Sequence, residues 1–289
     1  KKEGFEITLL EVHSDGIVRP EELEAAIRDD TALVTIMYAN NEIGTIQPIP
    51  ELAAVCKKHK VLFHTDAVQA VGNVPIDVKA QGIDLMSFTG HKIHGPKGCG
   101  ALYIRRGVRL QNLIDGGAQE RSRRAGTENT AGIVGLAAAV KEATKDIPGR
   151  VARLTKLRDK LIAGASKIDR SHLNGHPTKR MAGNFNMCFE GIEGESLLLS
   201  LDLKGVCGSS GSACTSGSLD PSHVLLSLGM PHEIAHGSLR LTLSDENTEE
   251  DVDYILEVLP PIVERLRSMS PLWERIQKEN RPPFQFQDR

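Results

Sequence analysis

Short apolar runs alternate with helical patterns in the first half of the chain, and this alternation limits the fold more than any other feature. The runs typical of strands cover 31–39, 61–65, 85–89 and 101–104. A helical pattern over 49–59 separates the first two runs, and its last turn is basic, as suits a helix C-terminus. Strands that alternate with helices pair in parallel, and apolar strands without polar alternation are buried on both faces. We therefore expect an α/β fold whose mainly parallel sheet has helices on both faces.

The second half of the chain is typical of a smaller α+β unit. Strand patterns cover 184–189 and 238–243, and helical patterns cover 150–168, 195–201, 222–228 and 249–267. Thr248 and Asp251 fit a capping box at the start of the last helix. We predict a large domain over 1–147 and a small C-terminal domain over 148–289. The tail at 281–289 has no periodicity, and we expect it to be mobile.

Composition excludes several classes of protein. Of the 289 residues, 40% are hydrophobic and 25% are charged, which is typical of a globular chain. A net charge of −3 gives no electrostatic reason to bind nucleic acid or an anionic membrane. No apolar run approaches the length of a transmembrane helix. The five scattered cysteines form no CxxC pair, which favours a reducing, cytoplasmic location without structural disulfides or zinc. The chain opens with KKEG and no Met, so we expect it to belong to a longer protein.

Two segments place reactive side chains at the ends of predicted strands. Asp66 directly follows the run VLFHT, and ligands of open α/β sheets lie beyond the carboxyl ends of strands. There a carboxylate either holds a cationic ring nitrogen or caps the following turn. Lys92 follows the strand at 85–89 and is either a Schiff-base nucleophile in a dry pocket or a solvated surface lysine. His91 and His94 have no third ligand nearby in sequence, so we expect no metal site.

Two further candidates lie in the second half. Residues 209–218 read SSGSACTSGS, and seven of these ten are Ser or Gly, which predicts a mobile loop. Cys214 lies at its centre and is either a nucleophilic thiol or an incidental exposed one. Arg240 lies within an apolar strand and needs an anionic partner, either a substrate carboxylate or a structural acid. Together these residues supply the lysine, acid and arginine that pyridoxal phosphate chemistry needs, with a thiol as acceptor.

The chain resembles the group I cysteine desulfurases of the NifS/IscS type, which belong to the class V aminotransferases and have fold type I of the pyridoxal phosphate enzymes. The resemblance runs from 39–44 to 270–274. It rests on HTDAVQAVG, SFTGHKIHGPKG, RAGTEN, EGESLLLSLD, SSGSACTSGS and HGSLRLTLS in this order. It implies an enzyme that removes sulfur from L-cysteine, leaving L-alanine and an enzyme-bound persulfide. The sulfur then serves iron–sulfur cluster assembly or another transfer, through an acceptor such as a scaffold protein.

The resemblance also implies a role for each matching residue. Lys92 would bind pyridoxal phosphate covalently and remove the substrate proton, His91 would assist proton transfer, and Cys214 would accept the sulfur. Arg240 and Asn41 would hold the substrate. Thr127 would reach the cofactor phosphate of a partner subunit in a homodimer. The implied cofactor-binding residues are Asp66, Gln69, Asn41, Thr89, His91, Lys92 and Thr127.

One departure and two alternatives accompany this interpretation. The resemblance implies an N-terminal part with a Gly-Ala-Thr-Glu phosphate loop and a ring-stacking histidine, neither of which is present in these 289 residues. We therefore expect the chain by itself not to be fully active. One alternative is another lyase with the same cofactor, such as a selenocysteine lyase, which has less need of a long cysteine loop. The other is a non-catalytic assembly subunit, which needs none of Lys92, Asp66, Cys214 and Arg240.

Overall fold

The computed structural model describes residues 4–211 and 221–286 of the chain. The chain forms two compact units, and neither is continuous in sequence. Unit 1 comprises residues 1–22, 39–47 and 149–289, and unit 2 comprises residues 23–38 and 48–148. The chain therefore leaves and re-enters unit 1, and the short segment 39–47 belongs to unit 1 although its sequence neighbours belong to unit 2. The predicted boundary between residues 147 and 148 stays a prediction.

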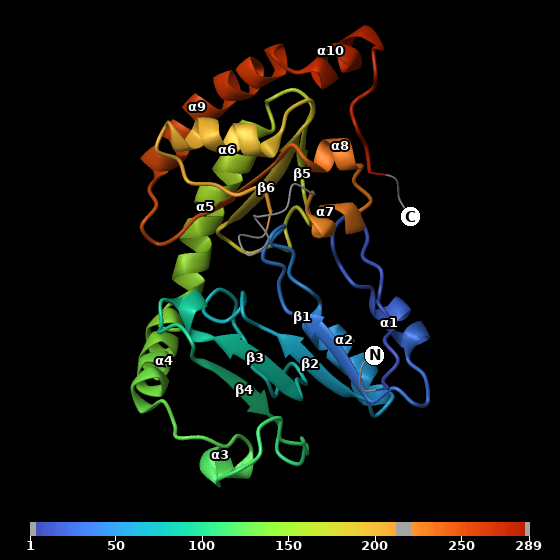
Figure 1. Cartoon of the computed structure of the whole chain (residues 1–289), viewed down its shortest axis with the longest axis vertical. Coiled ribbons are helices and arrows are strands. Elements are labelled where there is room, and N and C mark those ends of the chain that lie inside the picture. Colours follow the sequence, from blue (N-terminus) through green and yellow to red (C-terminus); the bar gives the residue numbers. More distant parts are fainter. Residues whose placement is uncertain (1–3, 212–220, 287–289) are drawn as a thin grey trace. The chain divides into compact units, whose positions relative to one another are not determined.

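Unit 2 is built on a four-stranded sheet with the order β1-β2-β3-β4 (Figure 1). The strands are β1 (Leu33–Met37), β2 (Leu62–Asp66), β3 (Leu85–Thr89) and β4 (Gly100–Ile104). The first three are parallel and β4 is antiparallel to β3, which confirms the predicted α/β fold with a mainly parallel sheet. In β1 and β2 the side chains of one face are buried and those of the other are more exposed.

The helices of unit 2 follow from local signals in the sequence. Helix α2 (Ile49–Lys58) joins β1 to β2, buries its apolar side and ends on two lysines, as expected. A 3-10 turn, η1 (Gly90–Ile93), follows β3 directly. The short helix α3 (Gln119–Ser122) precedes α4 (Thr130–Ala143), whose first turn is capped by Asn129. The unit boundary falls within α1 (Pro20–Ala26) and α5 (Ile147–Ala165).

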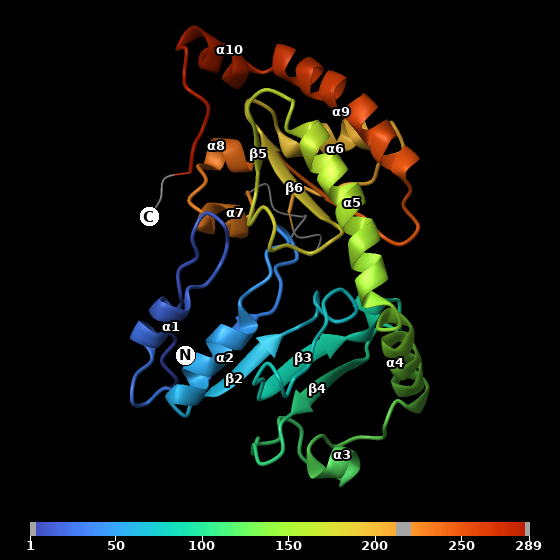
Figure 2. The same cartoon turned by 180° about the vertical axis from the view of Figure 1, so that it is seen from behind.

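Unit 1 contains a three-stranded antiparallel sheet, β5-β6-β7. Its strands are β5 (Ser171–Leu173), β6 (Asn184–Phe189) and β7 (Ser238–Thr242). Every residue of β6 is buried, and α5, α6 and α9 contribute to the apolar core beside it. Figures 1 and 2 show α9 running along α6 in both views. The helices that follow α5 are α6 (Gly194–Asp202), α7 (His223–Ser227), α8 (His232–Ala235), α9 (Glu249–Ser268) and α10 (Pro271–Lys278).

Two details of unit 1 test local predictions. The capping box of Thr248 and Asp251 is present, which confirms the predicted start of α9. Helix α5 starts at Ile147, before the predicted start at residue 150, and its first turn contains Pro148 and Gly149. Backbone N–H groups in the first turn have no intrahelical partner, so neither residue interrupts the helix there.

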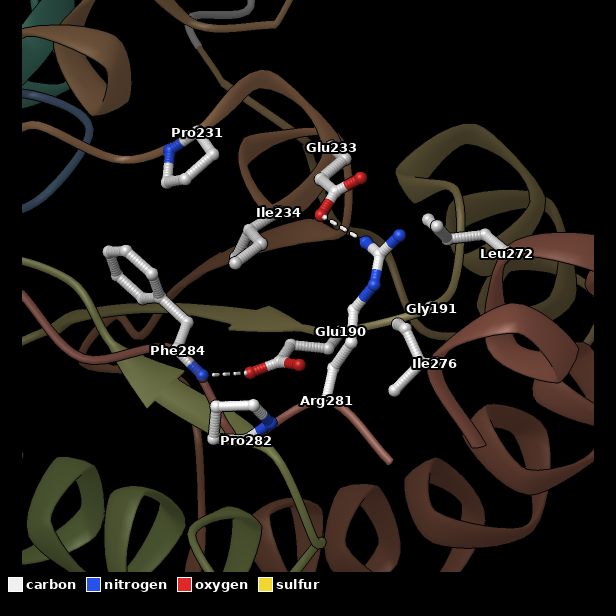
Figure 3. A pocket seen from close by; sticks show the side chains of 10 residues that line it. All are labelled: Glu190, Gly191, Pro231, Glu233, Ile234, Leu272, Ile276, Arg281, Pro282 and Phe284. Atoms are coloured by element: carbon white, nitrogen blue, oxygen red, sulfur yellow. Dashed lines mark hydrogen bonds and ion pairs between the residues drawn. The ribbon is translucent and has the colours of Figure 1, made fainter. Parts of the chain in front are cut away.

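The tail after α10 is anchored, and the prediction of a mobile tail is wrong for its described residues. The Phe284 N–H donates to Oε1 of the buried Glu190 at 2.7 Å, and Arg170 donates to the carbonyl of Arg281. Glu190 also pairs with Arg170 at 2.9 Å and with His172 at 2.6 Å. Arg281, Pro282 and Phe284 of the tail line a cavity of about 190 Å³. Figure 3 shows them together with Ile234, Leu272 and Ile276, which also line it.

Glu190 is the centre of this anchor, and its ionisation should control the stability of unit 1. Burial raises the pKa of Glu190, but hydrogen bonds from the Phe284 N–H, His172 and Arg170 outweigh burial, and the pKa lies below its ordinary value. The ionised form is therefore favoured in the folded state. Its contribution is complete above the unfolded-state pKa of about 4.3 and is lost as the pH falls through the lower folded pKa.

We predict that Glu190→Gln lowers the free energy of unfolding by about 3 kcal/mol at pH 7, because the half-buried guanidinium of Arg170 loses its anionic partner. The difference from wild type should shrink as the medium becomes acid. Urea unfolding at several pH values measures both effects. Glu233→Gln is the matched control, because Glu233 pairs with Arg281 at 3.4 Å in an exposed position. Equal stability of Glu190→Gln and wild type at pH 7 would contradict the prediction.

Candidate active site

The first group of predicted site residues lies at one edge of the unit 2 sheet. Strand β2 ends at Asp66, whose register partner in β3 is Ser87. Strand β3 ends at Thr89 and leads directly into η1, which carries His91 and Lys92. Adjacent parallel strands present their carboxyl ends at the same edge, which is where ligands of open α/β sheets bind. The sheet therefore brings the predicted acid and the predicted lysine to one edge.

Asp66 both caps its turn and keeps an oxygen available. Its Oδ1 accepts a hydrogen bond from the Val68 N–H at 2.9 Å, so the capping alternative is confirmed. The side chain is nevertheless exposed, and Oδ2 accepts no hydrogen bond from any residue in the ranges 4–211 and 221–286. Gln69 lies half-buried in the same turn, where its carbonyl accepts from Asn73 at 3.0 Å. Capping therefore does not prevent Asp66 from meeting a cation.

Thr89, His91 and Lys92 form a short polar cluster after β3. The Thr89 hydroxyl lies 2.9 Å from Nδ1 of His91 and 3.2 Å from the carbonyl oxygen of Cys99. A hydroxyl has one proton, so when Thr89 donates to that carbonyl, Nδ1 of His91 is the donor and Nε2 carries the lone pair. Lys92 is exposed, and its ammonium group makes no hydrogen bond or ion pair with the described residues.

A row of polar side chains beside Asp66 was missed by the sequence reasoning. His64 lies 2.7 Å from the Thr35 hydroxyl and 3.2 Å from the Ser87 hydroxyl, so the row crosses β1, β2 and β3. Burial lowers the pKa of His64, although the charge of Asp66 opposes this. The sequence signal was the period of two along a strand, which places His64 and Asp66 on the same face.

The donor set at this edge fits pyridoxal phosphate. It offers an amine without a carboxylate partner among the described residues, a carboxylate with an available oxygen and a hydroxyl paired with an imidazole. The amine suits the aldehyde of the cofactor, the carboxylate suits its pyridine nitrogen, and the hydroxyl with its imidazole suits its phosphate. Thr127 is exposed before α4, and its side chain has no hydrogen bond to another predicted site residue in the described structure. Within the same ranges, no group of three His, Cys, Asp or Glu side chains is arranged to hold a metal ion.

The second group lies in unit 1, where Arg240 and Asn41 meet. Nη1 of Arg240 donates to the main-chain carbonyl of Asn41 at 3.0 Å. The main chain of Arg240 is paired on both sides, with Asn186 of β6 in register and with Ser209 in an isolated bridge. The two residues predicted to hold the substrate are therefore brought together although they are 199 residues apart in the sequence.

A buried polar network holds the segment 39–47 against β6, and the sequence reasoning missed it. The carbonyl oxygen of Glu42 accepts from the side-chain amides of Asn184 at 2.9 Å and Asn186 at 3.0 Å. Arg180 donates to the carbonyl of Ile43 and to Oδ1 of Asn184, both at 3.0 Å. Burial lowers the pKa of Arg180 to about 10. The available signal was the pair of asparagines in the strand NFNMCF, because buried polar side chains need partners.

Cys214 lies in 212–220, outside the described residues. Of the other cysteines, Cys56, Cys99 and Cys188 are buried and Cys207 is exposed. Burial raises the pKa of Cys56 to about 11 and that of Cys188 to about 12, so neither is a thiolate at neutral pH. No helix in the ranges 4–211 and 221–286 has both the length and the apolar character needed to cross a membrane.

Comparisons with known proteins agree on one family. The model of the aminotransferase class-V family matches residues 1–255. A relative from Methanosarcina thermophila named "Cysteine desulfurase IscS" is 62% identical over 270 residues, which cover 93% of this chain and 67% of the relative. A solved structure described as "NIFS-LIKE PROTEIN" has a TM-score of 0.83 at 38% identity and covers 92% of this chain and 70% of its own. Another, "SspA in complex with cysteine", has a TM-score of 0.71 at 36% identity, covering 83% of this chain and 67% of its own. The chain therefore belongs to the aminotransferase class-V family and, within it, to the cysteine desulfurases.

Proposed function

We propose that this chain carries the substrate-binding and sulfur-accepting residues of a pyridoxal phosphate-dependent cysteine desulfurase that acts on L-cysteine. The observation that carries the proposal is the sheet edge where two neighbouring parallel strands end. Asp66, whose Oδ2 accepts no hydrogen bond from the described residues, ends β2, and Lys92, without an acidic partner among them, lies in the turn after β3. The cysteine bound in the SspA structure supports the choice of substrate. The products are L-alanine and a persulfide on the enzyme.

Each residue of the unit 2 edge has a role toward the cofactor. Pyridoxal phosphate, when bound, supplies an electron sink for the negative charge that forms at the substrate Cα. Lys92 would hold the cofactor covalently, and Asp66 would accept a hydrogen bond from its ring nitrogen. Thr89 and His91 would hold the phosphate, with the Thr89 hydroxyl turning its proton from the Cys99 carbonyl to a phosphate oxygen. The remaining cofactor contacts are assigned to Gln69, to Asn41 and, from the second copy in a homodimer, to Thr127.

Arg240 orients the substrate in this proposal. A guanidinium group presents several N–H donors in one plane, which suits a carboxylate. The hydrogen bond from Nη1 to the Asn41 carbonyl fixes the plane of the guanidinium group. Lys92 then removes the Cα proton as a general base, since an amine released beside that carbon is the nearest acceptor. His91 assists the proton transfers through Nε2.

Sulfur moves in one balanced step. The thiolate of Cys214 attacks the substrate sulfur, so an S–S bond forms while the Cβ–S bond breaks. The electron pair of the broken bond stays with Cβ, which takes up a proton and becomes the methyl group of alanine, and Lys92 returns a proton to Cα. Cys214 is oxidised to the persulfide and Cβ is reduced, and no other oxidant or reductant is needed. We further propose a cytoplasmic location and delivery of the persulfide sulfur to an acceptor such as an iron–sulfur scaffold protein.

We predict that Lys92→Ala abolishes covalent binding of pyridoxal phosphate by the intact protein. The measurement is borohydride reduction of the purified protein followed by peptide mass spectrometry, which shows the mass added at position 92 in wild type. Lys97→Ala is the matched control, because Lys97 is another exposed lysine in the same turn region. Retention of a reducible cofactor adduct in Lys92→Ala would exclude the assigned role.

We predict that Cys214→Ser abolishes persulfide formation and leaves cofactor binding intact, because the thiol acts only after the cofactor has activated the substrate. Mass spectrometry after addition of L-cysteine reports the persulfide, and the visible absorbance of the bound cofactor reports the site. Cys207→Ser is the control, since Cys207 is an exposed cysteine outside the interval 212–220. A persulfide that persists in Cys214→Ser, or a loss of cofactor absorbance, would count against this role.

A further inference from the structure

Glu42 is a buried carboxylate to which the proposed reaction gives no role. The residue is 2% exposed. Its Oε2 accepts a hydrogen bond from the Ser222 hydroxyl, which is the one side-chain hydrogen bond of this carboxylate within the ranges 4–211 and 221–286. Removing a carboxylate from water costs several kcal/mol. Burying Glu42 with this hydroxyl as its side-chain partner among the described residues therefore costs free energy. The contact with Ser222 indicates the role of the side chain.

Ser222 connects Glu42 to the chain beside the segment that contains Cys214. It is the N-cap of α7 and accepts hydrogen bonds from the N–H groups of Val224 at 3.1 Å and Leu225 at 3.4 Å. Its hydroxyl proton goes to Glu42, so the hydroxyl is held from both sides. Ser222 thus fixes the point at which the described chain resumes after residues 212–220.

The residues before that segment are paired with β7, and Gly211 lies close to Glu42. Ser209 is paired with the main chain of Arg240, with hydrogen bonds of 3.0 and 2.6 Å, and Ser238 donates to the carbonyl of Ser210. A Cβ atom placed on Gly211 would lie 3.5 Å from Oε2 of Glu42. Gly211 and Ser222, which flank the interval 212–220, therefore both lie close to the carboxylate of Glu42.

The main chain of the same two residues performs a separate task. The Asn41 carbonyl orients Arg240, and the Glu42 carbonyl is held by the amides of Asn184 and Asn186. The carboxylate takes no part in those hydrogen bonds. Changing the side chain of Glu42 therefore leaves the anchoring of Arg240 in place and changes only the contact with Ser222.

We propose that Glu42 is a positioning residue for sulfur transfer: its buried carboxylate holds Ser222 and so fixes the described chain that resumes after the interval containing Cys214. The proposal rests on the proposed function. Because binding of the substrate carboxylate depends on Arg240 and not on Ser222, loss of the Glu42 contact slows the transfer of sulfur and leaves the affinity for L-cysteine unchanged.

The test uses the intact protein loaded with pyridoxal phosphate. Glu42→Gln, which keeps the shape and removes the charge, should slow alanine formation in a single turnover by roughly tenfold to a hundredfold, the equivalent of one hydrogen bond to a charged group. The KM for L-cysteine and the cofactor absorbance should stay at their wild-type values. Arg240→Lys is the comparison, because loss of the planar fork should raise KM.

A second pair of variants separates positioning from helix capping. Ser222→Ala should reproduce the slow transfer, and Ser222→Thr, which keeps the hydroxyl, should restore the rate. Thr248→Ala removes the N-cap of α9 in the same unit and should leave the rate at the wild-type value. If Glu42→Gln does not fold, Ser222→Ala and Ser222→Thr test the proposal in its place.

The outcomes are distinct. A wild-type rate in Glu42→Gln, or a slow Ser222→Thr, overturns the assignment of Glu42. A raised KM in Glu42→Gln, as in Arg240→Lys, also overturns it, because the carboxylate then acts on substrate binding. A wild-type protein that binds the cofactor but forms no persulfide overturns the proposed function instead.

Discussion

The carbonyl oxygen of Glu42 needs hydrogen-bond partners inside the protein, and the way it obtains them organises the substrate side of unit 1. Two asparagine amides from the fully buried strand β6 donate to it, and Arg180 holds the next carbonyl. These bonds tie the segment 39–47 to the sheet. A buried carbonyl left without a partner would cost about 1–3 kcal/mol, so the segment has little freedom. The Asn41 carbonyl and Arg240 take their positions from this anchoring.

A different constraint governs unit 2, where the chemistry follows from strand direction. Parallel strands deliver Asp66, Thr89 and the 3-10 turn with Lys92 to one edge of the sheet. The strands hold the main chain rigid, and the positions at their ends leave Asp66 and Lys92 exposed to solvent, as side chains that bind a ligand must be. The polar row through His64 continues this edge across the sheet.

Local signals predicted the elements well where pattern and burial agree. The strands at 85–89 and 184–189 have the predicted bounds, and the capping box at Thr248 is present. The prediction failed for the tail, because its order depends on Glu190, Arg170 and His172, which are remote in sequence. The pattern of residues within the tail carries no information about Glu190, whose carboxylate accepts a hydrogen bond from the Phe284 N–H.

Residue types and their spacing were enough to predict the fold class, the strands that end in Asp66 and Thr89, and the set of a lysine, an acid and an arginine that suits pyridoxal phosphate. These follow from residue type and local spacing, which act over a few residues. Local spacing could not predict that Arg240 donates to the Asn41 carbonyl or that Ser222 donates to Glu42, because these contacts arise from the packing of the folded chain. Those contacts join distant segments, and they exist because buried carbonyls and carboxylates take whichever donors the packed sheet places beside them.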